Sequence, residues 1–283
     1  MPSIRLLPPE IVNRIAAGEV VERPASIVKE LVENAIDAHA TEIEVDIEEG
    51  GRRRVTVRDN GHGMDGDDLR LAFQSHATSK LREEDCEGGL FGIATLGFRG
   101  EALASIAAVA EVEAVSRPPR SEHAFRYVPA RDEIKPAAAP PGTVIEVRNL
   151  FYNVPARRKF LRAATAETSR IVEQMTRLAL GFPSIRFRLT SAGGRVHLDC
   201  AVADSLRERV LQIVGDEHAL DLVEVRGGDD ENPPVLRGFV GLPAWRARNA
   251  SHQHFFVNGR WVRDRSLSHA LRSAYQGLLV PGL

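Results

Sequence analysis

A stripe of polar side chains on one predicted helix offers acid–base and metal-binding chemistry. In residues 24–38 the apolar residues recur with the spacing of a half-buried α-helix. At about 100° per residue, Glu30, Asn34 and Asp37 fall within about 60° of one another on the opposite side. Most stripes of this kind only face solvent. Two carboxylates and an amide together can also accept a proton and coordinate a cation through oxygen.

An acidic residue and two glycines follow the next predicted hairpin. Asp59 comes directly after the alternating segment 54–58, and Met64 follows Gly61 and Gly63. The two glycines permit positive φ angles and a close approach of the backbone. The carboxylate is an acceptor for an exocyclic amine such as that of adenine. The same D-x-G-x-G pattern also occurs in ordinary turns.

Glycines and hydroxyl groups further along the chain suit phosphate. Residues 95–103 place glycines before a strong helix-forming run. Backbone N–H groups at the start of such a helix bind phosphate, helped by the helix dipole, although a plain glycine-rich hinge would look similar. Just upstream, Thr78, Ser79 and Lys80 offer two hydroxyls and a cation, and Thr143 begins a later strand with a hydroxyl.

In this order, the motifs resemble the signature of the GHKL, or Bergerat-fold, ATPases. That signature combines E-x-x-x-N, D-x-G-x-G, G-F-R-G-E-A and G-T, and is shared by gyrase, heat-shock chaperones, histidine kinases and MutL. Longer strings resemble the MutL family of DNA mismatch repair proteins in particular, from residue 4 to the end of the chain. They are IAAGEVVERPAS (15–26), KELVEN (29–34), HATSK (76–80), GFRGEAL (97–103), FYNVPARRKFL (151–161) and VNGRWVRDR (257–265).

The resemblance implies ATP and Mg²⁺ as ligands. Glu30 is expected to be the general base for the water that attacks the γ-phosphate, and Asn34 to coordinate Mg²⁺. Asp59 is expected to select adenine, and Thr143 to support the base end of the site. The expected nucleotide-binding residues, some of them in a lid over the triphosphate, are Asn34, Asp59, Gly61, Gly63, Met64, Thr78, Ser79, Lys80, Gly97, Phe98, Arg99, Gly100, Glu101, Ala102, Leu103 and Thr143.

The sequence also departs from the family pattern in two places. In MutL-like proteins a lysine of the second domain, within a string similar to V-N-V-H-P, reaches the γ-phosphate, and the sequence ends at Leu283 without that string. The chain is therefore expected to be a fragment that lacks the C-terminal dimerisation domain and hydrolyses ATP slowly. Endonuclease activity is not expected of it. Extra glycines in residues 83–91 also depart from the usual lid.

The elements that must position these residues predict an α+β fold. Residues 42–48 and 54–58 alternate apolar and polar side chains around Gly50 and Gly51, which predicts a β-hairpin. We expect a Bergerat sandwich over residues 1–155, with a mixed or antiparallel sheet and helices on one face. Its further elements are a short helix at 67–74, a mobile loop or lid at 87–100, a helix at 101–110, and strands at 111–116, 123–128 and 143–148.

A second, smaller α/β domain is expected over residues 156–283, with the boundary inside 151–162. The pattern restarts there with a long amphipathic segment. The expected elements are helices at 165–180, 205–214 and 266–275, and strands at 185–190, up to 198, 222–225, 235–240 and 255–257.

Composition bounds the class of protein. Apolar residues make up 43% and charged residues 27%, which is typical of a globular protein. No apolar run reaches the roughly 20 residues of a membrane span, and the first residues lack the pattern of a secretory signal, so a cytoplasmic, bacterial-type protein that acts at the nucleoid is expected. Cys86 and Cys200 lack the spacing of a zinc site, and the histidines show no metal-ligand pattern.

Charge is distributed unevenly along the chain. Residues 1–50 hold 11 acidic and 4 basic residues, whereas residues 151–190 hold 8 basic and 2 acidic ones. Basic clusters suit a polyanion, although a scattered set of solvated arginines is the simpler explanation. The candidate contacts to DNA phosphates are Arg157, Arg158, Lys159, Arg260, Arg263 and Arg265.

The resemblance further implies an ATP-dependent switch in mismatch repair. The expected partners are DNA, bound largely without regard to sequence, a second copy of the chain, a MutS-like mismatch-recognition protein and a downstream nuclease or helicase. A nucleotide-regulated chaperone is one alternative, and it would show no steep salt-dependent binding to DNA. A topoisomerase-type ATPase is another, but none of Tyr127, Tyr152 and Tyr275 stands in a recognisable cleavage context.

Overall fold

The structure is a computed structural model that describes residues 17–18, 20–80, 95–97, 100–229, 234–243, 245 and 252–278. Packing divides the chain into two compact units. Unit 1 comprises Met1–Met175 and Arg186–Asp199, and unit 2 comprises Thr176–Ile185 and Cys200–Leu283. The chain therefore crosses between the units three times.

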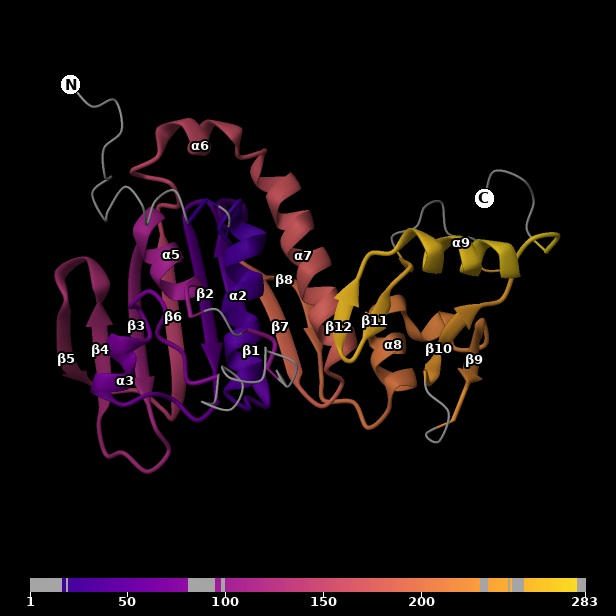
Figure 1. Cartoon of the computed structure of the whole chain (residues 1–283), viewed down its shortest axis with the longest axis horizontal. Coiled ribbons are helices and arrows are strands. Elements are labelled where there is room, and N and C mark those ends of the chain that lie inside the picture. Colours follow the sequence, from indigo (N-terminus) through magenta and orange to yellow (C-terminus); the bar gives the residue numbers. More distant parts are fainter. Residues whose placement is uncertain are drawn as a thin grey trace, which may run out of the picture. The chain divides into compact units, whose positions relative to one another are not determined.

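Unit 1 is built on a mixed sheet of eight strands (Figure 1). The strand order is β5-β4-β3-β6-β2-β1-β7-β8. All pairings given by register are antiparallel except that of β1 with β7, which is parallel. The strands are β1 (Glu42–Glu48), β2 (Arg54–Asp59), β3 (Glu111–Arg117), β4 (Ala124–Val128), β5 (Glu133–Ala137), β6 (Gly142–Arg148), β7 (Arg186–Ser191) and β8 (Arg195–Cys200).

Helices α2 (Pro24–Asp37) and α5 (Ala102–Val109) lie over one face of this sheet (Figure 1). In α2 the apolar stripe is buried, with Ile27, Val28 and Val32 fully covered. Pro24 stands in the first turn, where its missing N–H costs no intrahelical hydrogen bond. Burial of this face fixes the rotation of the helix, so the polar stripe points away from the sheet.

The α+β class predicted from the sequence is confirmed. The short helix α3 covers Gly66–Leu71, a narrower span than expected. The predicted lid lies in part outside the described residues. The sequence did not predict three short elements, β5, β12 (Arg260–Val262) and α6 (Pro155–Phe160). Each has six residues or fewer, too few for a periodic pattern to stand out.

Strands β7 and β8 belong by packing to unit 1, although the sequence placed them beyond residue 155. They follow α7 (Ala164–Gly181), and β7 pairs with β1 from Glu42↔Arg186 to Ile47↔Ser191. Because the two paired segments lie far apart in sequence, no local pattern of residues could have predicted their pairing. The division at residue 155 remains a proposal about functional domains.

The described residues of unit 2 form two small antiparallel sheets and the α-helices α8 and α9. Strands β9 (Leu222–Gly227) and β10 (Leu236–Gly241) form one sheet, and β11 (Phe255–Val257) and β12 form the other. The helices are α8 (Leu206–Val214), which Ser205 caps, and α9 (Arg265–Ala274), which Asp264 caps. None of the helices in the described part of the chain is long and apolar enough to cross a membrane.

Candidate nucleotide site

The polar stripe of α2 holds a cation against its oxygen atoms. Lys80 Nζ lies 2.7 Å from Asn34 Oδ1 and 2.6 Å from Asp37 Oδ2. The side chain of Asp37 is only 7% exposed and that of Lys80 20%. An amide oxygen and a carboxylate on adjacent turns of one helix therefore form a site of negative potential that accepts a positive charge.

Asp37 also binds the backbone of the segment that precedes α5. Its Oδ1 accepts a hydrogen bond from Leu96 N at 2.9 Å, and its Oδ2 accepts one from Gly97 N at 3.1 Å. A Cβ atom at Gly97 would lie 3.1 Å from Lys80 Nζ, so glycine permits the closest approach. Lys80, an expected triphosphate contact, and residues 95–97 of the expected lid are thereby fixed to α2.

Glu30 and Glu33 share one ammonium group on the same helix. Lys29 Nζ lies 2.9 Å from Glu30 Oε1 and 2.8 Å from Glu33 Oε2. Burial raises the pKa of Glu33, and the charges of Glu30 and Asp37 act in the same direction, while Lys29 opposes them. The Glu30 side chain is 24% exposed, so water can reach its carboxylate.

Asp59 forms a second polar centre where β2 ends. It stands opposite Thr143 in the β2–β6 ladder, and its Oδ1 accepts a hydrogen bond from Gly61 N at 2.9 Å. Burial raises the pKa of the Asp59 carboxyl, although hydrogen bonds from the backbone N–H groups of Gly61 and Thr143 partly offset this effect. A half-desolvated carboxylate of this kind is a strong and selective acceptor for an N–H donor.

Ser116 joins the strands and the loop around Asp59. Its fully buried hydroxyl accepts a hydrogen bond from Met64 N at 2.8 Å and lies 2.8 Å from Thr143 Oγ1. The same hydroxyl donates a hydrogen bond to the carbonyl oxygen of Gly142 at 3.2 Å. One hydroxyl on β3 therefore sets the position of both the D-x-G-x-G loop and the start of β6.

Other predicted site residues surround these two centres. Gly63 has a φ of +62°, and a Cβ atom there would clash with the carbonyl oxygen of Arg117. Thr78 and Ser79 are not buried, and Thr78 Oγ1 accepts a hydrogen bond from Lys80 N at 3.1 Å. Gly100, Glu101, Ala102 and Leu103 form the start of α5, with Glu101 at its N-cap. Phe98 and Arg99 lie outside the described residues.

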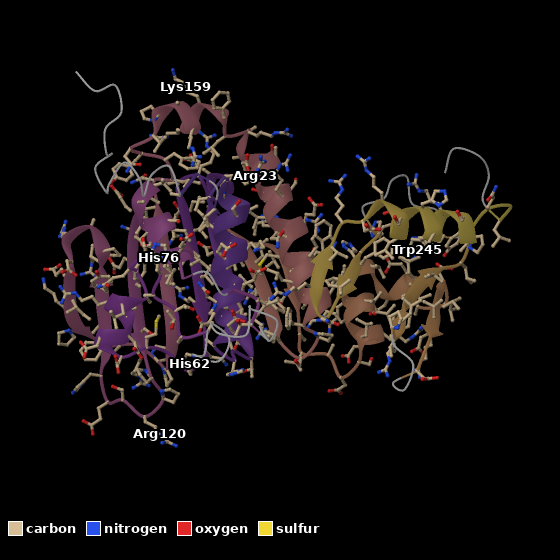
Figure 2. The ribbon with its side chains drawn as sticks, viewed as in Figure 1. Arg23, His62, His76, Arg120, Lys159 and Trp245 are labelled. Carbon is tan, nitrogen blue, oxygen red and sulfur yellow. The ribbon has the colours of Figure 1, made fainter. Side chains whose placement is uncertain are left out.

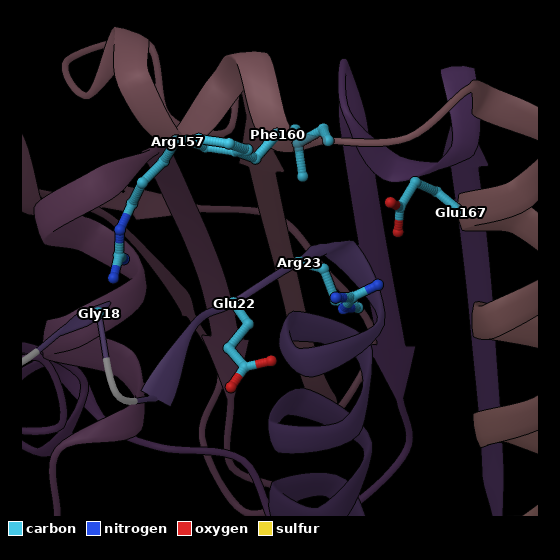
Figure 3. Close-up of a pocket in the computed structure, with 7 residues that line it drawn as sticks. Gly18, Glu22, Arg23, Arg157, Phe160 and Glu167 are labelled. Carbon is cyan, nitrogen blue, oxygen red and sulfur yellow. The ribbon is translucent and has the colours of Figure 1, made fainter.

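Two hollows in the described part of unit 1 are lined by other residues. One, of about 230 Å³, is lined by residues directly before α2 and on α6 and α7 (Figure 3). The other, of about 200 Å³, is lined by Arg158, Leu161 and residues within 49–53 and 149–150. The proposed DNA contacts Arg157, Arg158 and Lys159 lie on α6 in unit 1. Arg260, Arg263 and Arg265 are exposed around β12 and α9 in unit 2.

Sequence reasoning missed two residues that organise the site. Asp37 was placed on the polar stripe without a role, because the segments that it binds lie more than forty residues away in sequence. Ser116 had a detectable signal. It alternates with Val112 and Ala114 on the buried side of a strand, and a hydroxyl among apolar side chains there implies hydrogen-bonding partners inside the protein.

Comparison with known proteins adds independent findings. The family described as "Histidine kinase-, DNA gyrase B-, and HSP90-like ATPase" matches residues 22–127. The family described as "DNA mismatch repair protein, C-terminal domain" matches residues 210–282. The first match contains Asn34, Asp37, Lys80 and Asp59, and ends before Thr143.

Similar proteins are mismatch repair proteins of bacteria. The DNA mismatch repair protein MutL of Anaeromyxobacter dehalogenans strain 2CP-C is 47% identical over 288 residues, which cover 100% of this chain and 46% of that protein. MutL of Paramagnetospirillum magneticum is 48% identical over 287 residues, covering 98% of this chain and 46% of the relative. The chain thus spans about half the length of these curated relatives.

Solved structures with the same fold point to the same family. The Aquifex aeolicus MutL ATPase domain complexed with ADP has 30% identity and a TM-score of 0.64, covering 90% of this chain and 88% of that one. The crystal structure of the N-terminal domain of a DNA repair protein has 25% identity and a TM-score of 0.77, with coverages of 94% and 82%. With its GHKL-type fold, the chain belongs to the MutL family of DNA mismatch repair proteins.

Proposed function

We propose that the chain binds and slowly hydrolyses ATP, with Mg²⁺ as the required cation. The observation that carries the proposal is the contact of Lys80 Nζ with Asn34 Oδ1 and Asp37 Oδ2, beside the backbone of Gly97. A cationic side chain, the backbone N–H groups of Leu96 and Gly97 and side-chain oxygen atoms meet there, which are the kinds of group that bind a phosphate chain with its metal ion. The similar Aquifex aeolicus domain is described as complexed with ADP.

This placement supports the following residue roles. Glu30 is the general base, since its carboxylate is accessible and lies one turn before Asn34 on the same stripe. Asp59 accepts the exocyclic amine of adenine, and Thr143 supports the base through its hydroxyl. Thr78, Ser79, Lys80 and the backbone of residues 97–103 contact the triphosphate, with Phe98 and Arg99 among them. Gly61, Gly63 and Met64 line the adenine end.

The donor set fits Mg²⁺. This ion keeps several waters, takes oxygen ligands and is often held by one or two side chains together with substrate phosphates. Asn34 Oδ1 supplies such an oxygen, and in the described residues a positive charge already lies against it. In that part of the chain, no group of three or more His, Cys, Asp or Glu side chains could hold a metal ion.

The nucleotide is proposed to drive a switch rather than a metabolic reaction. ATP changes the conformation of the protein, promotes its dimerisation and alters its contacts with a MutS-like protein and a downstream nuclease or helicase. DNA is bound largely without regard to sequence through the basic residues of α6 and of the β12–α9 region. These steps take place in the cytoplasm, at the nucleoid. Turnover is expected to lie well below the median enzyme rate of about 10 s⁻¹.

The decisive experiment separates binding from hydrolysis. Glu30→Ala is expected to retain affinity for a fluorescent ATP analogue, while phosphate release falls by roughly 10²-fold or more. Asn34→Ala is expected to lose both, and omission of Mg²⁺ should reproduce the Asn34 variant. Glu33→Gln, which alters the neighbouring carboxylate, is the matched control. Full hydrolysis by the Glu30 variant would overturn its role as the base.

A further inference from the structure

Arg157 extends from α6 toward the chain segment that leads into α2 (Figure 3). Its Nη1 donates a long hydrogen bond of 3.5 Å to the carbonyl oxygen of Val21. Val21 is fully buried and comes shortly before Pro24, where α2 begins. The contact therefore joins two segments that are 136 residues apart in sequence.

Gly18 leaves the space that the guanidinium of Arg157 occupies. A Cβ atom at Gly18 would clash with Nη2 of Arg157 and lie 2.9 Å from its Cζ. Gly18 is helical, and Val21 N donates a hydrogen bond to Ala17 O at 2.9 Å, so the guanidinium lies where a helical turn ends. Carbonyl groups at such an end lack an intrahelical donor, and the helix dipole favours a positive charge there.

Phe151 supports Arg157 from within unit 1. The guanidinium carbon lies 5.6 Å from the centroid of the Phe151 ring, within the range of cation–π attraction. The ring is 1% exposed. Phe151 has a φ of +60°, a left-handed conformation that is rare for a bulky residue and persists only where the surrounding structure holds it. The aromatic partner of Arg157 is therefore fixed by its own contacts.

Phe151 and Asn153 are bound in turn to the end of α5. Phe151 N donates a hydrogen bond to Val109 O at 2.8 Å, and Asn153 Nδ2 donates one to Ala108 O at 2.9 Å. Val109 is the last residue of α5, the helix whose start includes expected triphosphate contacts. Arg157 therefore completes a chain of contacts between the segment before α2 and the end of α5.

The next two cations of α6 are placed differently. Arg158 and Lys159 are exposed, whereas Arg157 is half-buried. Lys159 projects from α6 away from the body of unit 1 (Figure 2). The three consecutive basic residues thus divide into one that packs within unit 1 and two that face solvent.

We propose that Arg157 is a positioning residue of the ATPase site, which holds the segment at Gly18 and Val21 and so fixes the start of α2 relative to α5. Glu30 lies on α2, and the expected triphosphate contacts of residues 97–103 lead into α5, so hydrolysis requires the two helices in a fixed relative position. A displacement of about 1 Å at the reacting groups can lower a rate by roughly 10²-fold. The inference rests on the proposed ATPase function, and it leaves Arg158 and Lys159 as the α6 candidates for DNA contact.

Amide hydrogen exchange and steady-state kinetics of the whole 283-residue chain test this role. Arg157→Ala should speed exchange in residues 17–23, because the segment loses its contact. Its kcat should fall by about 5-fold or more, while affinity for the fluorescent ATP analogue changes by less than about 2-fold, since binding contacts tolerate a small displacement better than the attack of water does. Exchange in β9 and β10 of unit 2 should not change, which excludes global unfolding as the cause.

Arg158→Ala is the matched control. It removes the same charge from the adjacent, exposed residue, so it should change neither exchange in residues 17–23 nor kcat. Equal effects of the Arg157 and Arg158 variants would overturn the positioning role, because the loss would then depend only on charge. Faster exchange at unchanged kcat would overturn it as well, because the contact would then serve structure alone.

Gly18→Ala tests the contact from its other side. In the wild-type background the added methyl group should displace the guanidinium and speed exchange in residues 17–23. In the Arg157→Ala background the clash is absent, and alanine, the better helix former, should slow exchange instead. An effect of the same sign in both backgrounds would overturn the contact. If the wild type hydrolyses no ATP, the proposed function fails, whereas the reversal of sign would still support the contact itself.

Discussion

We expect Asp59 to make nucleotide affinity sensitive to pH. In its proposed role the ionised carboxylate accepts the adenine amine, and burial raises its pKa above the ordinary 3.8. As the pH falls from neutral, affinity for an ATP analogue should therefore decline at a higher pH than an ordinary aspartate would allow. Asp59→Asn should bind more weakly and lose this dependence. A wild-type affinity that is flat down to the onset of acid unfolding would contradict the assignment.

The same pKa shift has a consequence for stability. Because the folded-state pKa of Asp59 is raised above its unfolded value, the folded protein holds the proton more tightly. The ionised carboxylate therefore costs stability once the pH exceeds the folded-state pKa. Asp59→Asn should not lower the free energy of unfolding at neutral pH, even though it lowers affinity. Such a separation is the mark of a residue kept for binding.

Ser116 is expected to act on affinity through its neighbours. Ser116→Ala leaves the backbone N–H of Met64 without its acceptor, which lowers the free energy of unfolding by about 1–3 kcal/mol for a buried group. The substitution also removes the hydrogen bond that holds the Thr143 hydroxyl. We expect the KM for ATP to rise more than kcat falls, and Ser116→Thr to recover part of the affinity. Ser121→Ala, which removes an exposed hydroxyl, is the control. An equal fall in kcat at unchanged KM would argue for a catalytic effect instead.

At the scale of elements, one side chain couples α2 to the segment before α5. Asp37→Ala removes the acceptor of Leu96 N–H and Gly97 N–H and the carboxylate partner of Lys80. Amide hydrogen exchange at residues 95–97 should become faster, and affinity for the ATP analogue should fall. Glu33→Ala, on the same helix, should leave exchange at residues 95–97 unchanged. Equal exchange in wild type and the Asp37 variant would show that other contacts hold this segment.

The sequence predicted those elements whose pattern is local. The buried stripe of α2 determines which way Glu30 and Asn34 face, and the alternating segment of β2 places Asp59 at its end, so these residues could be singled out from the sequence alone. Contacts between distant segments could not be inferred in this way. The parallel pairing of β1 with β7 and the contact of Lys80 with Asp37 depend on how the whole chain folds, and no periodicity encodes either.

At the scale of the whole molecule, we expect nucleotide to drive self-association. The sequence has apolar segments at residues 6–7 and 11–21, of which the structure describes only 17–18, 20 and 21, and such segments need a surface to cover them. If ATP orders the lid, that lid can support the N-terminal arm of a second copy, and binding energy then favours the dimer by linkage. An arm packed permanently on its own domain is the alternative.

Light scattering distinguishes these two arrangements. With Mg²⁺ and a non-hydrolysable ATP analogue the measured mass should double, and a variant without residues 1–19 should remain monomeric. Asn34→Ala, which is expected to lose nucleotide, should also remain monomeric and serves as the control. A protein that stays monomeric at high concentration, or a dimer that forms equally well without the arm, would refute arm exchange.

The triple crossing of the chain between the units limits how the protein can be divided. A truncation near residue 155 would remove α7, β7 and β8, and β1 would become the edge of the sheet. Its backbone groups from Glu42 to Ile47, which otherwise pair with β7, would then be open to strands of other molecules. Such a shortened ATPase piece would tend to precipitate during expression, whereas a piece that continues through Cys200 would keep the sheet closed on that side.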